Sequence, residues 1–191
     1  SSINATWANP LIAGIQCCSG RQHHSKAVVI APDLGLPPLR NEAEEAAICL
    51  GRTNSPLTRI GEELKLRRKQ GTPAKELHLL AHGNSQGIQL ADAWIDQAAL
   101  LRHAADIAEW QISTLVLWCC QIGQNQAFID QLREIAKAEI FTSQSRINKE
   151  AIQTSNPYGD TRQLSELVPI SELQSWQGDL AWIQIDDEIE G

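Results

Sequence analysis

Two apolar runs decide the fold: Leu77-His78-Leu79-Leu80-Ala81-His82-Gly83 and Leu115-Val116-Leu117-Trp118-Cys119-Cys120. Runs of this length, rich in Leu and Val and bounded by Gly or polar residues, are typical of central strands in a parallel sheet covered by helices. In such sheets, chemistry collects just beyond the carboxyl ends of the strands. We therefore expect His82 and Cys120 to emerge side by side from neighbouring strands and to face one cleft.

The sequence around these runs alternates between strand and helix patterns. Residues 26–32 predict a first strand and residues 139–143 a further strand after the one carrying Cys120, and residues 87–90 followed by Trp94 predict a hairpin. Capping residues and apolar spacing predict four helices. The first runs from Asn41 through Ile48, and the fourth begins at Gly123. The second and third are indicated by apolar residues at helical spacing: Leu57, Ile60 and Leu64 before Gly71, and Leu100, Ala104, Ile107 and Ala108. This alternation predicts a three-layer α/β fold, with a mostly parallel central sheet flanked by helices.

The two ends of the chain are less regular than its centre. Residues 1–25 show no clear period, and we expect them to form an amino-terminal arm. Residues 26–147 carry the alternating pattern and form the predicted core. In residues 148–191 the pattern weakens to a turn cluster, a short helix over 171–177 and an edge strand over 180–185, so we expect this segment to pack on the same domain.

Composition limits the classes of partner. The chain has 191 residues, with 16 basic and 23 acidic side chains and a formal charge of −7, which disfavours nucleic acid and anionic membranes as partners. No apolar stretch approaches the roughly 20 residues that span a bilayer, so we expect no membrane insertion. Because Met is absent even at position 1, we expect the chain to be a piece of a longer product.

The five cysteines lack the spacing of a disulfide framework, and free thiols are the expected state. Cys17-Cys18 with His23-His24 is the strongest zinc candidate, but compact zinc sites separate paired cysteines by two or more residues. The acidic residues 186–190 lack the spacing of a calcium loop and predict a solvated tail. We therefore expect no metal and no cofactor.

Thiol attack on an acyl carbon needs an activated thiol, a proton donor for the leaving amine and amide donors for the oxyanion. Cys120 and His82 supply the first two, and the amides of Gly83 and Cys120 supply the third. If a helix begins at Gly123, its amino terminus would also lower the pKa of the Cys120 thiol. This pattern predicts a thiol hydrolase.

Simpler interpretations compete with this one. A Cys at the end of an apolar strand is often a small buried hydrophobe, and His-Gly is a common turn. Cys119 is a rival thiol, although strand alternation sends its side chain to the face opposite that of Cys120. His78 lies on the same face as His82, deeper along the strand, and a structural role is expected for it.

Both motifs resemble the His-Gly and small-residue-Cys motifs of caspase-like cysteine peptidases. Over residues 26–145, the chain is most similar to the caspase-like domain of uncharacterised function near the amino terminus of giant repetitive bacterial surface proteins. The resemblance implies a caspase-like fold, a His82/Cys120 dyad, oxyanion donors at Gly83 and Cys120, and a secreted or cell-surface location. Two positions depart from that pattern, because Cys119 stands where a small Gly or Ala is usual and Gln121 where an acid is usual.

The resemblance also implies where a substrate side chain binds. By analogy, the pocket for the residue before the cut is formed by Asp33, Trp118, Ser143 and Gln144. Asp33 is the carboxylate placed to meet a basic side chain, so a basic residue before the cut is expected.

Three functions follow from these residues and this resemblance. The first is a caspase-like cysteine endopeptidase whose partner is a peptide or protein substrate, including self-processing of its own longer parent chain. The second is a catalytically silent caspase-like module for binding or assembly, which the departures at Cys119 and Gln121 favour. The third is a thiol acyltransferase or amidase, because the fold does not fix the acyl acceptor.

Overall fold

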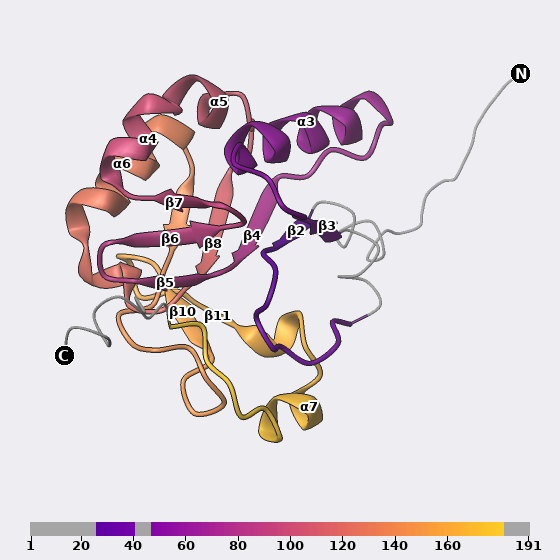
Figure 1. Cartoon of the computed structure of the whole chain (residues 1–191), viewed down its shortest axis with the longest axis vertical. Helices are drawn as coiled ribbons and strands as arrows, with labels where there is room; N and C mark the ends of the chain where they lie inside the picture. The colour runs from indigo at the N-terminus through magenta and orange to yellow at the C-terminus, as the bar shows by residue number, and fades with distance from the viewer. Residues whose placement is uncertain (1–25, 41–46, 182–191) are drawn as a thin grey trace, which may run out of the picture.

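A five-stranded parallel sheet lies at the centre of the molecule (Figure 1). The computed structural model describes residues 26–40 and 47–181. In spatial order the strands of this sheet are β3 (Ala47–Cys49), β2 (Lys26–Ile30), β4 (Glu76–Leu80), β8 (Thr114–Trp118) and β9 (Glu139–Phe141). The two apolar runs form β4 and β8, which are the third and fourth strands in this order and are paired along their whole length. Their side chains are almost all buried, as the continuous apolar sequence predicts.

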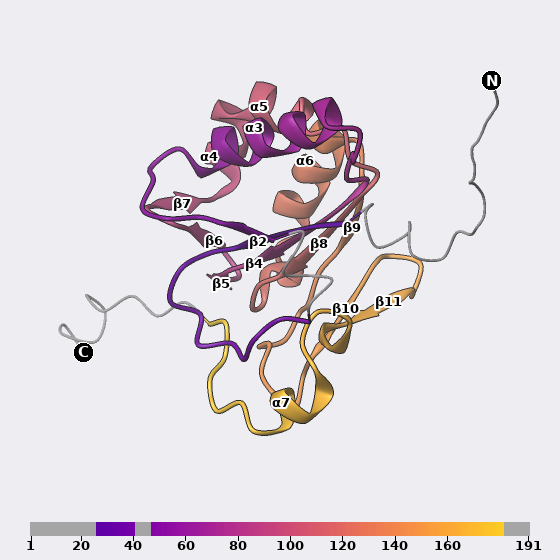
Figure 2. The same ribbon diagram turned by 90° about the vertical axis from the view of Figure 1, so that its right-hand side faces the viewer.

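Four helices cover one face of this sheet, as Figure 2 shows. They are α3 (Pro56–Lys69), α4 (Gln97–Arg102), α5 (Ala104–Ala108) and α6 (Gln126–Ala136). The connections from β3 to β4, from β4 to β8 and from β8 to β9 all step across the sheet in the same direction. Because crossovers between parallel strands are right-handed, steps in one direction leave their helices on one face.

The opposite face is covered by residues 31–40 and by the carboxy-terminal part of the chain (Figure 2). The elements there are β10 (Gln153–Ser155), β11 (Thr161–Gln163), a 3-10 turn η2 (Leu164–Glu166) and α7 (Ile170–Gln174). Arg40 joins the two segments, since its backbone N–H donates to Leu167 O at 2.8 Å and its Nε to Ser165 O at 2.8 Å. The predicted α/β fold is therefore confirmed, in an arrangement compatible with three layers.

A small antiparallel sheet follows β4 directly. Its strands are β5 (His82–Asn84), β6 (Gly87–Leu90) and β7 (Ala93–Ile95), which confirms the predicted hairpin. Gly87 is required by close packing, because a Cβ at this position would lie 2.6 Å from the backbone oxygen of Ile95. The hairpin positions His82 at the start of its first strand.

Several local predictions were wrong. Instead of completing a helix from residue 41, Ala47–Cys49 form the edge strand β3, because pairing with β2 satisfies their backbone groups. The predicted helix over residues 100–108 is broken at His103 into α4 and α5. The helix after Cys120 begins at Gln126, where the side chain of Asn125 caps it, and a 3-10 turn η1 (Ile122–Gln124) precedes it.

Other predictions hold or lie outside the described residues. The helix ending at the basic triplet is α3, and Gly71 follows it with a positive φ of 81°. Of the predicted edge strand over 180–185, Ala181 forms a single bridge to Gly83, and residues 182–185 are not among those described. The predicted arm over 1–25, with Cys17-Cys18 and His23-His24, and the acidic tail also lie outside the described residues. No described helix has the length and apolar character needed to cross a membrane.

Candidate active site

The sheet register brings His82 and Cys120 to the same edge. Leu80 on β4 is paired with Trp118 on β8, and the backbone N–H of Ala81 continues the ladder by donating to Trp118 O at 3.2 Å. His82 and Cys120 each follow these paired residues by two positions. Both side chains therefore belong to the carboxyl edge of adjacent central strands, where parallel sheets place their chemistry.

A backbone carbonyl orients the His82 ring. Nε2 of His82 lies 2.9 Å from the backbone oxygen of Asp33, in the left-handed turn (φ 65°) that follows β2. A carbonyl only accepts hydrogen bonds, so Nε2 carries the proton and donates it. Nδ1, which is buried, is then the nitrogen with the lone pair that a base needs. Asp33 thus contributes through its main chain.

The Cys120 side chain is buried, and its Sγ accepts a hydrogen bond from the backbone N–H of Ile147 at 3.1 Å. Burial raises the pKa of the thiol to about 11, and the negative charge of Asp179 adds to this rise. The backbone groups of Ile147 and Leu180 and the positive charge of Arg146 lower the pKa, but by less than burial raises it. The prediction that a following helix lowers this pKa was wrong, because η1 separates Cys120 from α6 and burial dominates. At neutral pH the resting thiol is protonated.

Cys119 occupies a different environment. It is fully buried, and burial raises the pKa of its thiol as well. A Cβ added to Gly83 would lie 3.3 Å from the Cβ of Cys119, so this side chain packs beneath β5. The two adjacent thiols therefore have different neighbours, with Cys119 next to Gly83 and Cys120 next to Ile147.

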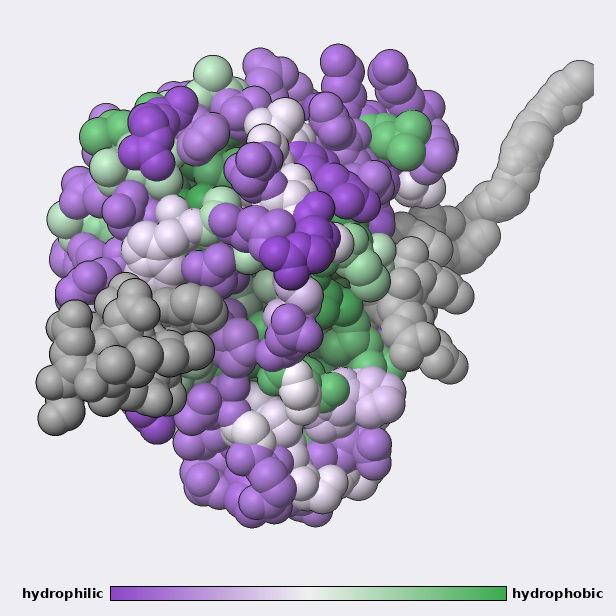
Figure 3. All heavy atoms as spheres, viewed as in Figure 1, coloured by the Kyte–Doolittle hydropathy of each residue, from purple (hydrophilic) through white to green (hydrophobic). Residues whose placement is uncertain are grey.

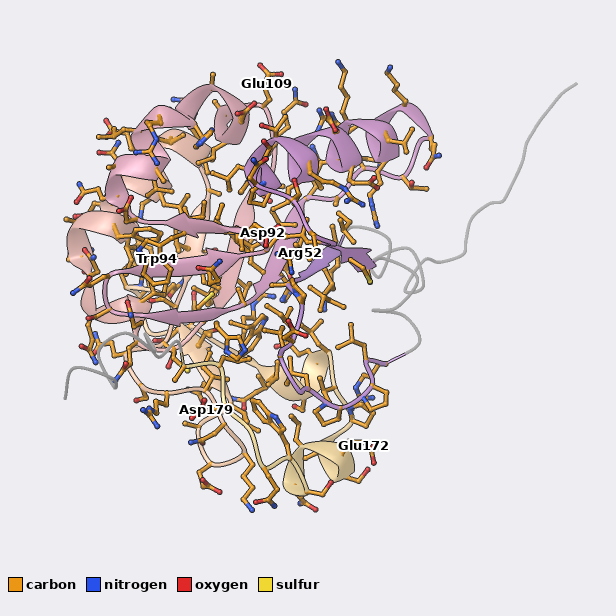
Figure 4. All side chains as sticks on the ribbon, viewed as in Figure 1. Arg52, Asp92, Trp94, Glu109, Glu172 and Asp179 are labelled. Carbon is orange, nitrogen blue, oxygen red and sulfur yellow. The ribbon has the colours of Figure 1, made fainter. Side chains whose placement is uncertain are left out.

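The Gly83 amide holds a carbonyl oxygen. Its N–H donates to the backbone oxygen of Leu180 at 2.8 Å, and Gly83 forms a parallel bridge with Ala181. Leu180 belongs to the segment after α7, which Figure 4 marks by the label of Asp179. Sequence reasoning missed Leu180 and Ile147 as parts of the site, because only long-range pairing brings them there.

The residues expected to bind substrate are dispersed. Asp33 and Gln144 are exposed, and the Gln144 oxygen accepts from Gln124 Nε2 at 2.7 Å. Ser143 is buried, and its hydroxyl exchanges hydrogen bonds of 3.1 Å with the backbone of Ser145. Trp118 is fully buried, and its indole is directed into the core.

Trp118 instead belongs to a buried ring network formed by Glu76, His78, Trp118 and Arg162. The indole Nε1 donates to His78 Nδ1 at 2.9 Å, so the proton of His78 is on Nε2, which is 2.6 Å from Glu76 Oε2. Arg162 Nη1 donates to the same carboxylate at 2.7 Å. Burial raises the pKa of Glu76, but the bonds from His78 and Arg162 outweigh it and lower the pKa to about 2. The structural role expected for His78 is confirmed.

An apolar pocket borders the His82 side of the site. Its volume is about 520 Å³, and Figure 3 shows the apolar area around it next to the loop that follows β2. Asp33, whose carbonyl holds His82, is among its lining residues, which otherwise come from the ends of β2, β3 and β4 and from the loop after β2. Within the described ranges, no cluster of three or more His, Cys, Asp or Glu side chains has the arrangement of a metal site.

Comparison with known proteins gives one family. The family described as "Domain of unknown function (DUF4347)" matches residues 38–155, which is more than half of the chain. The chain belongs to this family. No curated protein and no solved structure was found to match it. The match includes His82, Gly83, Cys120 and Ile147, so most of the site lies inside the DUF4347 domain, whereas Leu180 lies outside the matched residues.

Proposed function

We propose that this chain is a cysteine endopeptidase of caspase-like type that processes its own longer parent chain. The observation that carries the proposal is the peptide carbonyl of Leu180, which the Gly83 amide holds at 2.8 Å. This is the contact that an oxyanion donor makes to a substrate carbonyl. His82 and Cys120 each follow one of the paired strands β4 and β8 by two positions, at the same edge of the sheet.

The chemistry assigns a separate role to each group. Nδ1 of His82 accepts the thiol proton as Cys120 attacks the carbonyl carbon, and the resulting imidazolium protonates the leaving amine. Asp33 keeps the ring in the orientation that this transfer needs. Because the resting thiol has a pKa of about 11, the thiolate forms only as the proton moves to His82 during attack.

A matched pair of variants tests the proposal. The wild-type protein, Cys120→Ala and Cys119→Ala are incubated with a mixture of peptides, and the products are identified by mass spectrometry. The expected result is cleavage by the wild-type protein and by Cys119→Ala, and none by Cys120→Ala. Equal cleavage by all three proteins, or dependence on Cys119 alone, would contradict the assignment of Cys120.

The raised pKa of Cys120 favours a second candidate, a caspase-like binding or assembly module without turnover. A thiol that is buried and protonated at neutral pH is a poor nucleophile. Iodoacetamide or an acyloxymethyl ketone separates the two functions. Stoichiometric labelling of Cys120 at neutral pH by the ketone favours the enzyme, and no labelling together with no peptide cleavage favours the silent module.

A further inference from the structure

The segment Asp179-Leu180-Ala181 is paired on both sides at the carboxyl edge of the sheet. On one side, the backbone N–H of Leu180 donates to Ile147 O at 3.1 Å, and Asp179 forms an antiparallel bridge with Asn148. On the other side, Leu180 O accepts from the Gly83 amide, and Ala181 bridges to Gly83. An extended peptide that adds to strand edges in this way has the main-chain contacts of a bound ligand.

Side chains hold the same segment. Leu180 is 0 % exposed, so its side chain is enclosed by protein on all sides. Asp179 Oδ2 lies 3.4 Å from Arg146 Nη1, and Asp179 Oδ1 accepts the Ala181 N–H at 3.1 Å. Arg146 precedes Ile147, so one short loop after β9 contacts both the main chain and the charged side chain of the segment.

The candidate nucleophile lies against this segment. Ile147 contacts both partners, because its N–H donates to Cys120 Sγ at 3.1 Å while its oxygen accepts from Leu180. The backbone of Leu180 also lowers the pKa of the Cys120 thiol, as a nearby N–H does. The thiol therefore lies beside the backbone of this segment, and the carbonyl of Leu180 is bound to the Gly83 amide.

We infer that this segment is the substrate of the site in cis and that the bond between Leu180 and Ala181 is the one that is cut. The inference rests on the proposed endopeptidase function and names its substrate. Cys120 Sγ forms a bond to the carbonyl carbon of Leu180, and the thiol proton passes to His82. The carbon–nitrogen bond to Ala181 then breaks, and His82 gives its proton to the Ala181 amine. Water hydrolyses the thioester, which leaves a carboxylate on Leu180 and restores the thiol.

The buried Leu180 also defines the specificity. The residue before the cut is apolar, because the site encloses its side chain completely. This differs from the basic residue that the Asp33 carboxylate predicts. Two substitutions separate the alternatives: Leu180→Met keeps an apolar side chain of similar volume, whereas Leu180→Arg supplies the basic side chain.

The test is intact-mass analysis of the 191-residue chain during incubation, for the wild-type protein, Cys120→Ala, Leu180→Met and Leu180→Arg. The expected products of the wild-type protein are residues 1–180 and residues 181–191, and Cys120→Ala remains intact. The rate constant does not change with protein concentration, because the reaction is intramolecular. Leu180→Met is cut at a rate within a few-fold of the wild-type rate. Leu180→Arg is cut at least a hundred-fold more slowly, because burying an unpaired charge in an apolar pocket is unfavourable.

Separate results would overturn the inference and the proposed function. If the wild-type chain stays intact or is cut at another bond while it cleaves added peptides through Cys120, the inference fails and the endopeptidase stands. If the chain stays intact and no peptide is cleaved, both fail. Faster cleavage of Leu180→Arg overturns the apolar specificity, and a rate that rises with concentration overturns the reaction in cis. Circular dichroism of each variant checks that it is folded.

Discussion

The ring network and the candidate site lie at the same two neighbouring strands, β4 and β8, yet they use the same residue types in opposite ways. The candidate site consists of His82, Gly83, Cys120 and the segment 179–181. His78 and His82 are four residues apart. Both ring nitrogens of His78 are bonded to side chains, those of Trp118 and Glu76. Nε2 of His82 is bonded to a backbone carbonyl, which orients the ring, and in the proposed mechanism Nδ1 is the atom that transfers the proton.

Burial has opposite outcomes in the two regions. In the ring network, hydrogen bonds from His78 and Arg162 outweigh burial, so Glu76 stays ionised with a pKa of about 2. In the candidate site, burial outweighs the amide contacts, so Cys120 stays protonated with a pKa of about 11. The comparison shows that buried ionisable groups serve stability when charged partners surround them. They stay neutral when the partners are mainly backbone amides, as at Cys120.

The largest expected effect is that of His82→Ala on catalysis. Removal of the general acid and base lowers the rate of Cys120-dependent cleavage by about 10²- to 10⁴-fold. The Tm changes little, because the side chain is only half-buried and donates one hydrogen bond to a main-chain carbonyl. Cleavage kinetics and a thermal melt of the same preparation check both parts. An unchanged rate would remove His82 from the mechanism.

The matched change in the ring network is His78→Leu, which should affect stability instead of catalysis. It leaves the buried indole N–H of Trp118 without an acceptor and takes one of the two side-chain donors from Glu76, which keeps Arg162, and this costs about 3 kcal/mol of unfolding free energy. Urea unfolding measures this loss. The cleavage rate of the folded fraction stays near that of the wild-type protein. A large loss of rate with unchanged stability would erase the distinction between the two regions.

Glu76→Gln tests the electrostatics of the ring network through pH. The folded pKa of Glu76 is about 2, below its ordinary value of 4.5, so its stabilisation is complete above pH 4.5 and is lost as the pH falls toward 2. The shift corresponds to about 3 kcal/mol. In the wild-type protein, unfolding free energy therefore falls between these pH values, and in Glu76→Gln this part of the decrease is absent. Identical acid profiles of the two proteins would contradict the assignment.

Gly83→Ala tests how tightly the candidate site is packed. The added Cβ would lie 2.9 Å from the backbone oxygen of Gly87, so β5 must shift and carry the amide donor with it. A shift of this kind lowers the cleavage rate by about ten- to a hundred-fold. Gly35→Ala is a useful contrast, because nothing lies within 4 Å of its added Cβ, although its φ of 67° strains any other residue. Equal rates for Gly83→Ala and the wild-type protein would contradict the expected shift of this amide.

Asp179→Asn should give the smallest effect. Its carboxylate is one of the groups that raise the pKa of Cys120, so the substitution lowers that pKa and increases alkylation of Cys120 by iodoacetamide a few-fold near pH 9. The control is Asp130→Asn, a change at an exposed carboxylate on α6 that pairs with Arg133. Slower alkylation of Asp179→Asn would reverse the sign that the structure assigns.

The sequence predicted much of the core, and its errors share a physical cause. Continuous apolar runs predicted β4 and β8, and apolar residues at 3.6-residue spacing predicted α3 and α6. Both patterns can be seen in a short stretch of sequence, because they depend on which sides of one strand or helix are buried. Ala47 and Ile48 were predicted as the end of a helix, because the sequence of this segment does not show that one edge of β2 is available for pairing. The predicted start of a helix at Gly123 was wrong, because Gly123 is required by contact with Ser143 and does not open the helix.

The candidate site was also predicted only in part. His82, Gly83 and Cys120 follow from strand ends, and the register of β4 with β8 places them at one edge. Trp118 was expected to contact substrate, but its indole reaches back to His78. The segment that contains Leu180 was predicted only as an edge strand, because its sequence does not show which strand or loop it pairs with.

The sequence by itself determined that strands end on a His and a Cys in an α/β fold, because hydrophobic periodicity and strand length are properties of consecutive residues. Only the tertiary structure decided that Asp33 orients the imidazole, that burial keeps the Cys120 thiol protonated, and that Leu180 lies between Gly83 and Ile147. These are long-range contacts. Their partners come together when the chain closes around the sheet, and the pKa of a side chain depends on those partners and on burial rather than on its neighbours in the sequence.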